Sequence, residues 1–122
     1  MTMQLLDSNI LIYSAKPEFA YLRKLIVQSN YVSVISKIEV LGYHKLNEKD
    51  ANYLTACFNV LSGLTIDNNV IEKAIEIRKE NNLSVADSII AATCLLFNLE
   101  LKTNNIADFK NVKGLKTDNP VK

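Results

Sequence analysis

Short apolar runs alternate along this chain with longer segments of helical periodicity. Residues 3–6 form the first run, which has the length of a buried strand, and the apolar pattern resumes at residues 10–13 as in a short helix to about Ala15. Pro17 is well placed to open a second helix through Gln28. That helix presents one inward face, made of Leu22, Leu25, Ile26 and Ser29.

The same alternation continues through the middle of the chain. Residues 31–35 are rich in β-branched and aromatic side chains, which predicts a second strand, followed by a helix that begins near Ser36. Residues 48–61 predict a further helix with Gly63 just past its end, and residues 64–66 predict a brief strand.

Two helices and two strands are predicted in the last part of the chain. The first helix is capped by Asp67 or Asn68, and the second begins at Ser84 and runs to about Phe97, apolar nearly all round as in a central core helix. The strands are expected at residues 99–103 and, as a last edge strand, at residues 114–117.

Alternating strands and helices imply a mainly parallel sheet covered on both faces. We therefore predict an α/β fold, a three-layer α/β/α sandwich with a short mainly parallel sheet. The length of 122 residues predicts a single domain over residues 1–122. Ligands of such folds bind at the carboxyl ends of the strands, near the point where the strand order reverses.

Composition narrows the setting but leaves the partner undecided. The 14 basic and 13 acidic residues give a net charge of +1, so no overall field indicates a nucleic acid or a membrane surface. No run approaches the roughly 18 apolar residues of a membrane span, and no basic stretch precedes the first apolar run, so we expect neither a membrane association nor export. Cys57 and Cys94 lack metal-like spacing, which favours buried thiols in a reducing cytoplasm.

Four carboxylates stand out because each follows a strand or opens a helix. In a doubly wound sheet such positions converge on one edge, and the four residues are Asp7, Glu39, Asp87 and Asp108. Clustered carboxylates repel and raise each other's pKa, which a protein keeps mainly where a cation offsets the charge. Oxygen ligands favour Mg²⁺ or Mn²⁺, whereas zinc prefers His or Cys, and His44 has neither nearby in sequence.

Helix capping is the competing explanation for the same carboxylates. Ser36 with Glu39, and Ser84 with Asp87, match the capping box, in which the serine and the acid bond each other's backbone amides. Asp7 can likewise be a simple N-cap. Capping accounts for two or three of the acids one by one, but it does not explain why all of them converge.

Four segments of the chain resemble the PIN-domain nucleases, and within them the VapC-like toxins of toxin–antitoxin pairs. They cover nearly the whole chain in order, at residues 6–13, 36–43, 86–93 and 102–109. The resemblance implies an acidic pocket with one or two divalent ions, Mg²⁺ or Mn²⁺, and hydrolysis of RNA phosphodiester bonds. It also implies a small antitoxin protein as partner and a homodimer.

Carried over position by position, the resemblance assigns the acids. Asp7 and Asp87 match the main metal ligands, and Glu39 matches a ligand through water or the base for the attacking water. In some members the last acid stands at the position of Asn105, which is an amide here, and Asp108 follows three residues later. Both residues remain candidates for the last position.

Hydroxyls, lysines and aromatic side chains near the motifs are further candidates. Ser8 and Thr103 can bind a metal-bound water or a phosphate oxygen, or only the nearby backbone. Four lysines either follow an RNA backbone or form a solvated face: Lys102, Lys110, Lys113 and Lys116. Three aromatic residues either stack on a base or belong to the core: Tyr13, Tyr43 and Phe109.

Two other functions fit parts of the pattern. A signalling receiver domain has a similar length and an acidic Mg²⁺ pocket, and Asp67 after the middle strand is the candidate phosphoacceptor. A PIN-fold binding protein without catalytic activity is the other alternative, and the amide of Asn105 is the feature that favours it.

Overall fold

The computed structural model describes residues 3–28 and 30–122. Its elements alternate along the chain as the sequence predicts, in the order β1 (Gln4–Leu6), α1 (Ser8–Ser14), the 3₁₀ helix η1 (Pro17–Leu22), α2 (Arg23–Val27), β2 (Tyr31–Ser33), α3 (Val34–Leu41), α4 (Glu48–Val60), β3 (Ser62–Leu64), α5 (Asn68–Glu80), α6 (Val85–Phe97), β4 (Glu100–Lys102), α7 (Ile106–Phe109) and β5 (Thr117–Asp118).

The five described strands form one sheet in the order β3-β2-β1-β4-β5, and every neighbouring pair is parallel. β1 is central, and the chain builds outward from it in one direction through β2 and β3 before it crosses to β4 and β5 on the other side. The strand order therefore reverses between β1 and β4, which is where folds of this class bind ligands.

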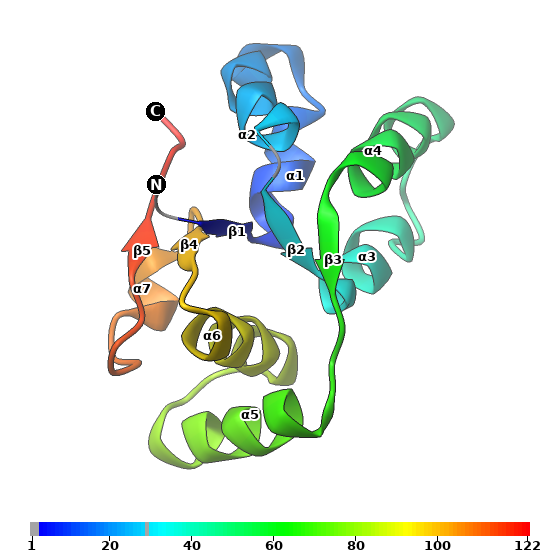
Figure 1. The fold of residues 1–122 in the computed structure, drawn as a ribbon. Helices are drawn as coiled ribbons and strands as arrows, with labels where there is room; N and C mark the ends of the chain where they lie inside the picture. The colour runs from blue at the N-terminus through cyan, green and yellow to red at the C-terminus, as the bar shows by residue number, and fades with distance from the viewer. Residues whose placement is uncertain (1–2, 29) are drawn as a thin grey trace.

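Apolar side chains cover both faces of the sheet, which confirms the predicted α/β/α layers. Leu5 and Leu6 are fully buried on opposite faces because successive residues of a strand point to opposite sides. The cluster on the Leu5 face draws on α5, α6 and α7, and the cluster on the Leu6 face draws on α1, η1, α2, α3 and α4. Figure 1 shows α5 and α6 stacked on one side of the strands, away from α1 and α2.

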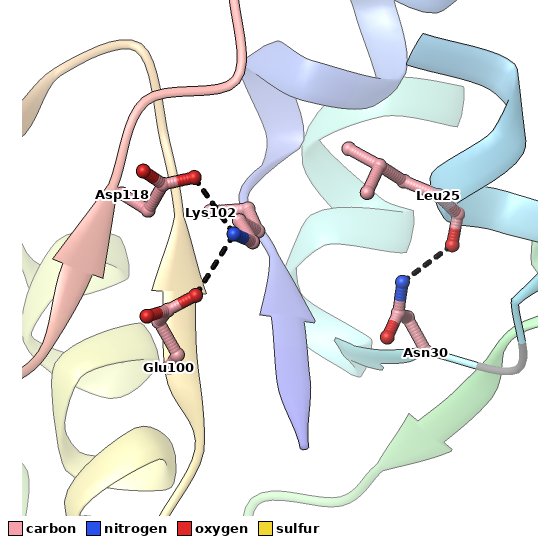
Figure 2. A network of polar contacts seen from close by, with 5 residues as sticks. All are labelled: Leu25, Asn30, Glu100, Lys102 and Asp118. Carbon is pink, nitrogen blue, oxygen red and sulfur yellow. Dashed lines mark hydrogen bonds and ion pairs between the residues drawn. The ribbon is translucent and has the colours of Figure 1, made fainter. Parts of the chain in front are cut away.

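The prediction of one continuous helix from Pro17 to Gln28 is wrong. Pro17 does open a helix, but it is the 3₁₀ helix η1, and Phe19 adopts non-helical angles (φ −113°, ψ 21°) that break the segment before α2. The ring of Phe19 packs against Tyr13 at 4.9 Å between centroids, a tertiary contact that the local pattern does not reveal. Asn30 then donates to the carbonyl oxygen of Leu25 at 2.5 Å and joins α2 to β2 (Figure 2).

Ser29 of the predicted inward face lies outside the described residues, and the rest of that face is buried.

Three element boundaries also differ from the prediction. The second strand ends at Ser33, which caps α3 by accepting from the amide of Ile35 at 3.2 Å, so Ser36 is not the cap. β3 comes two residues early, because its pairing with β2 and not its weak apolar pattern fixes its register. β5 begins only at Thr117, since Gly114 has a φ of 80° that belongs to a turn.

The predicted central helix α6 buries its middle, including Ile90 and Ala91, but Phe97 and Leu96 at its end are exposed. None of the described helices is long and apolar enough to cross a membrane.

Candidate functional site

Asp7 lies at the strand-order switch, directly after β1. The register of β1 with β4 pairs Leu6 with Lys102, so the next residues of the two strands, Asp7 and Thr103, lie side by side. The amide of Asp7 donates to the carbonyl oxygen of Lys102 at 2.9 Å and extends the ladder by one bond. Parallel pairing thus brings together two polar residues that are 96 positions apart in the chain.

Three donors hold the carboxylate of Asp7, which is only 5% exposed. The amide of Ser8 donates to Oδ1 at 2.8 Å, the hydroxyl of Thr103 donates to Oδ2 at 2.7 Å, and Asn9 Nδ2 donates to Oδ2 at 3.3 Å. The N-cap prediction for Asp7 is therefore confirmed, together with a contact to Thr103 that capping does not explain.

The charge on Asp7 is unfavourable in this environment. Burial raises the pKa of Asp7 from 3.8 to about 6, even though the hydrogen bonds from Thr103 and Ser8 lower it, and the charges of Asp87 and Glu39 raise it further. Through these charges, three of the predicted acids form one electrostatic cluster: Asp7, Glu39 and Asp87. The charge of Asp7 also affects Cys94. Burial first and this charge second raise the pKa of the Cys94 thiol to about 12.

Glu39 is held by a short chain of hydroxyl groups from two helices. Ser8 Oγ, on α1, lies 2.8 Å from Ser36 Oγ and 2.9 Å from Glu39 Oε1, both on α3. Ser36 is fully buried, so it links the two helices instead of capping α3 as predicted. Since Ser8 follows Asp7 directly, this chain fixes the exposed carboxylate of Glu39 relative to Asp7.

Asp87 lies in the first turn of α6. Its amide donates to Ser84 Oγ at 3.1 Å, so Ser84 caps the helix as predicted. Burial raises the pKa of Asp87, the hydrogen bond from Ser84 lowers it, and the charges of Asp108 and Glu39 raise it. Asp108, exposed in the first turn of α7, is thus linked to the cluster through Asp87.

Asn105 has a structural role in its backbone. It is the N-cap residue of α7, and its amide donates to Thr103 Oγ1 at 3.0 Å. The exposed side chain of Asn105 makes no cap hydrogen bond. Of the two candidates for the last acidic position, Asp108 is the one whose charge raises the pKa of Asp87.

Two asparagines in this region were missed by the sequence reasoning. Asn9, besides its bond to Asp7, accepts from the amide of Asn104 at 3.2 Å. Asn104 Nδ2 in turn donates to the hydroxyl of Tyr13 at 3.2 Å, and Asn119 Nδ2 donates to Asn104 Oδ1 at 3.1 Å. The signal was available, because two polar triplets, residues 7–9 and 103–105, follow neighbouring strands.

Lys102 forms ion pairs with two carboxylates outside the candidate cluster. Its ammonium group pairs with Glu100 at 2.8 Å, two residues earlier on the same strand, and with Asp118 at 2.7 Å, the facing residue of β5 (Figure 2). Burial lowers the pKa of Lys102, but the bonds to Asp118 and Glu100 outweigh it and the pKa is raised. Its charge is therefore engaged within the sheet, whereas three other candidates are exposed: Lys110, Lys113 and Lys116.

The three candidate aromatic residues have different surroundings. Phe109 is 1% exposed in the core on the Leu5 face, so its interpretation as a base-stacking residue is wrong. Tyr13 is half-buried against Phe19. Tyr43 alone of the three is exposed, beside the ring of His44, which is also exposed, at 5.3 Å between centroids.

The described acids do not form a complete set of metal ligands. In the part of the chain that the structure describes, no three or more side chains of His, Cys, Asp and Glu are grouped so that they could hold a metal ion. Mg²⁺ commonly takes only one or two carboxylates and keeps several waters. The charge of Asp87 raises the pKa of Asp7, and a bound cation relieves repulsion of this kind.

Comparison with known proteins identifies the fold family. The sequence profile described as "PIN domain" matches residues 5–115. The chain belongs to the PIN domain family. Membership in this family excludes the alternative of a receiver domain. Asp67, the candidate phosphoacceptor of that alternative, caps α5 by accepting from the amide of Val70 at 3.0 Å. A comparison with curated proteins gave no match.

Several solved structures resemble this PIN domain over nearly its whole length. A toxin–antitoxin complex from Klebsiella pneumoniae is 29% identical with a TM-score of 0.76, covering 92% of this chain and 94% of the other. FitAcB from Neisseria gonorrhoeae is 26% identical with a TM-score of 0.79, covering 97% and 98%. DNA-bound VapBC from Salmonella typhimurium, at 22% identity, shares the fold with a TM-score of 0.84 and covers 98% of each chain. The similarity to VapC-like proteins is thus confirmed.

Proposed function

We propose that this PIN domain is a metal-dependent endoribonuclease that hydrolyses RNA phosphodiester bonds. One observation carries the proposal: the buried carboxylate of Asp7, held by Ser8 and Thr103, lies close enough to Asp87 and Glu39 for their charges to raise its pKa. A protein keeps such repulsion mainly where a cation offsets it.

Asp7 and Asp87 are the proposed ligands of Mg²⁺ or Mn²⁺, with Glu39 as a ligand through water. When bound, the ion supplies charge relief for a phosphate oxygen and an activated water. Asp108, acting on Asp87, is the proposed group for a second ion, with Asn105 beside it. One ion or two are therefore compatible with the acids.

The chain's own residues orient the reacting groups. Thr103 and the amide of Ser8 fix both oxygens of Asp7, so a ligand bound there meets a carboxylate in one orientation. Ser8 Oγ holds Glu39 Oε1, so the second oxygen of Glu39 can accept the proton of an attacking water. No covalent intermediate with the protein is needed.

The exposed lysines after α7, Lys110, Lys113 and Lys116, are the proposed contacts to RNA phosphates. Lys102 was a candidate as well, but it can contribute only if it leaves Glu100 and Asp118.

The proposed biological role is that of the toxin of a toxin–antitoxin pair. The support is the similarity, at 29% identity, to a solved toxin–antitoxin complex from Klebsiella pneumoniae. The proposed partners are a small cognate antitoxin and a second copy of the chain. We propose a cytoplasmic site of action, where RNA is present and thiols such as those of Cys57 and Cys94 stay reduced.

Cleavage of end-labelled RNA with Mg²⁺ or Mn²⁺ tests the proposal. The wild-type chain should cut, and Asp7→Asn and Asp87→Asn should each lose at least 100-fold in rate. Glu76→Gln is the control, because its carboxylate pairs with Lys73 on the exposed side of α5. Undiminished cleavage in both Asn variants would refute the site.

A further inference from the structure

A groove beside Glu39 leads away from the acid cluster. It has a volume of about 340 Å³ and lies between α1, α3, the segment after α3 and the first turns of α4. Glu39 lines it and also accepts from Ser8, the neighbour of Asp7, so the groove is continuous with the candidate active site. Whatever lies in the groove therefore reaches the proposed catalytic base.

The lining combines an apolar floor, an exposed ring and two cations. Ile12, Val40 and Leu54 are apolar residues of the lining; Ile12 is 47% exposed, and the other two are buried beneath it. Tyr43, 54% exposed, supplies the ring. Apolar and aromatic side chains of this kind suit the π-face of a nucleobase, and such stacking tolerates any base.

The cations of the groove are Lys16 and Lys45. Within residues 3–28 and 30–122 neither forms an ion pair, unlike Lys102 and Lys73. A second carboxylate, Asp50, also lines the groove, but its Oδ2 accepts from Asn47 at 3.2 Å as part of the cap of α4. The lysines are therefore the charges available to a phosphate.

We propose that this groove binds a nucleotide of the RNA strand next to the scissile phosphate, with its base on Tyr43 and a phosphate on Lys16 or Lys45. The inference rests on the proposed function and adds a substrate subsite to it. Phe109, another of the aromatic candidates for base stacking, is buried and cannot stack on the base.

Two assays separate the subsite from the function. In cleavage of a 12-nucleotide single-stranded RNA pool, Tyr43→Ala should raise KM by about 5- to 150-fold with little change in kcat, as expected for the loss of one stacked base. Tyr43→Trp should restore KM. Phe97→Ala is the matched control, because Phe97 is 48% exposed and does not line the groove. The exposure of Tyr43 means that its variants should fold, which circular dichroism checks.

The second assay measures affinity for the same labelled RNA pool by fluorescence anisotropy, in the Asp7→Asn background to suppress cleavage. Tyr43→Ala should weaken binding by the same 5- to 150-fold. Lys45→Ala should reduce the slope of log K against log salt by about 0.7, the value for one phosphate of a single strand. Lys79→Ala, on α5, is the control and should leave the slope unchanged.

The outcomes are distinguishable. Wild-type cleavage with an unchanged KM and unchanged RNA affinity in Tyr43→Ala would overturn the subsite, leave the groove to a protein segment, and keep the proposed function. An inactive wild-type chain would overturn the proposed function, whereas weaker RNA binding by Tyr43→Ala would still support the subsite.

Discussion

Replacement of Asp7 by asparagine should stabilise the metal-free protein while it removes activity. The side chain is 5% exposed, and its pKa rises from 3.8 to about 6 through burial first and the charges of Asp87 and Glu39 after it. At 1.36 kcal/mol for each unit, keeping the carboxylate ionised at pH 7 costs the fold about 3 kcal/mol.

Asparagine keeps the shape of Asp7 without the charge. Its oxygen can still accept from the amide of Ser8, but its NH₂ group faces the hydroxyl of Thr103 and the NH₂ group of Asn9, which now donate to the aspartate. The loss of these bonds costs about 1 kcal/mol. The expected net gain in the free energy of unfolding is about 2 kcal/mol at pH 7.

The gain depends on pH with a definite sign. The folded state of the wild type holds a proton on Asp7 more tightly than the unfolded state, so between about pH 4 and pH 6 its stability falls as the pH rises. The advantage of Asp7→Asn should therefore be complete above pH 6 and should vanish near pH 4.

Urea unfolding in EDTA at pH 7.5 and pH 4.5 measures this effect, with Glu72→Gln, an exposed carboxylate on α5, as the control. The reasoning is refuted if Asp7→Asn is less stable than the wild type at pH 7.5, or equally more stable at both pH values. Added Mg²⁺ should stabilise the wild type and not the variant, because only the wild type carries the complete ligand pair.

Three further predictions follow from single residues. Phe109→Ala should lower the free energy of unfolding by about 3–5 kcal/mol in urea denaturation, because the ring is in the core; a change below 1 kcal/mol would contradict this placement. Gly114→Ala should cost about 1–2 kcal/mol in the same assay from the φ of 80° alone, because the new methyl group meets only Leu95 at an ordinary 3.6 Å; an unchanged midpoint would argue against the left-handed turn. Ser8→Ala should lower kcat for RNA by about tenfold or more, since Glu39 loses its donor; a stability loss without a change in kcat would reduce Ser8 to a packing role with Ser36.

Much of the fold could be predicted because burial and periodicity mark its central elements. β1 lies in a short apolar run and β4 in a segment that alternates apolar and charged residues, and each is followed by a polar corner, so their places and parallel pairing follow from the sequence. β3 could not be placed correctly, since Ser62 and Gly63 are exposed at the sheet edge and only pairing with β2 sets their register. The break at Phe19 likewise depends on packing against Tyr13, which no local pattern encodes.

The candidate site divides in the same way. Asp7 and Asp87 could be proposed because positions after strands and at helix starts converge in this topology. The contact of Ser36 with Ser8, 28 residues away, could not be predicted, because it depends on how α1 packs against α3. Neither interpretation of Lys102, an RNA contact or part of a solvated face, includes its pairing with Asp118, because that pairing depends on the register of β5, which begins later than predicted.

Titration calorimetry with Mn²⁺ at pH 7.5 tests the central claim most directly, namely that Asp7 and Asp87 together bind a divalent ion. The wild-type chain should release heat with a stoichiometry of one or two ions, and Asp87→Asn should lose at least one of them, while Glu76→Gln should bind as the wild type does. Heat that is unchanged in Asp87→Asn would contradict the ligand assignment. No heat in the wild type would contradict the metal site itself and would leave a PIN-fold binding protein without catalytic activity.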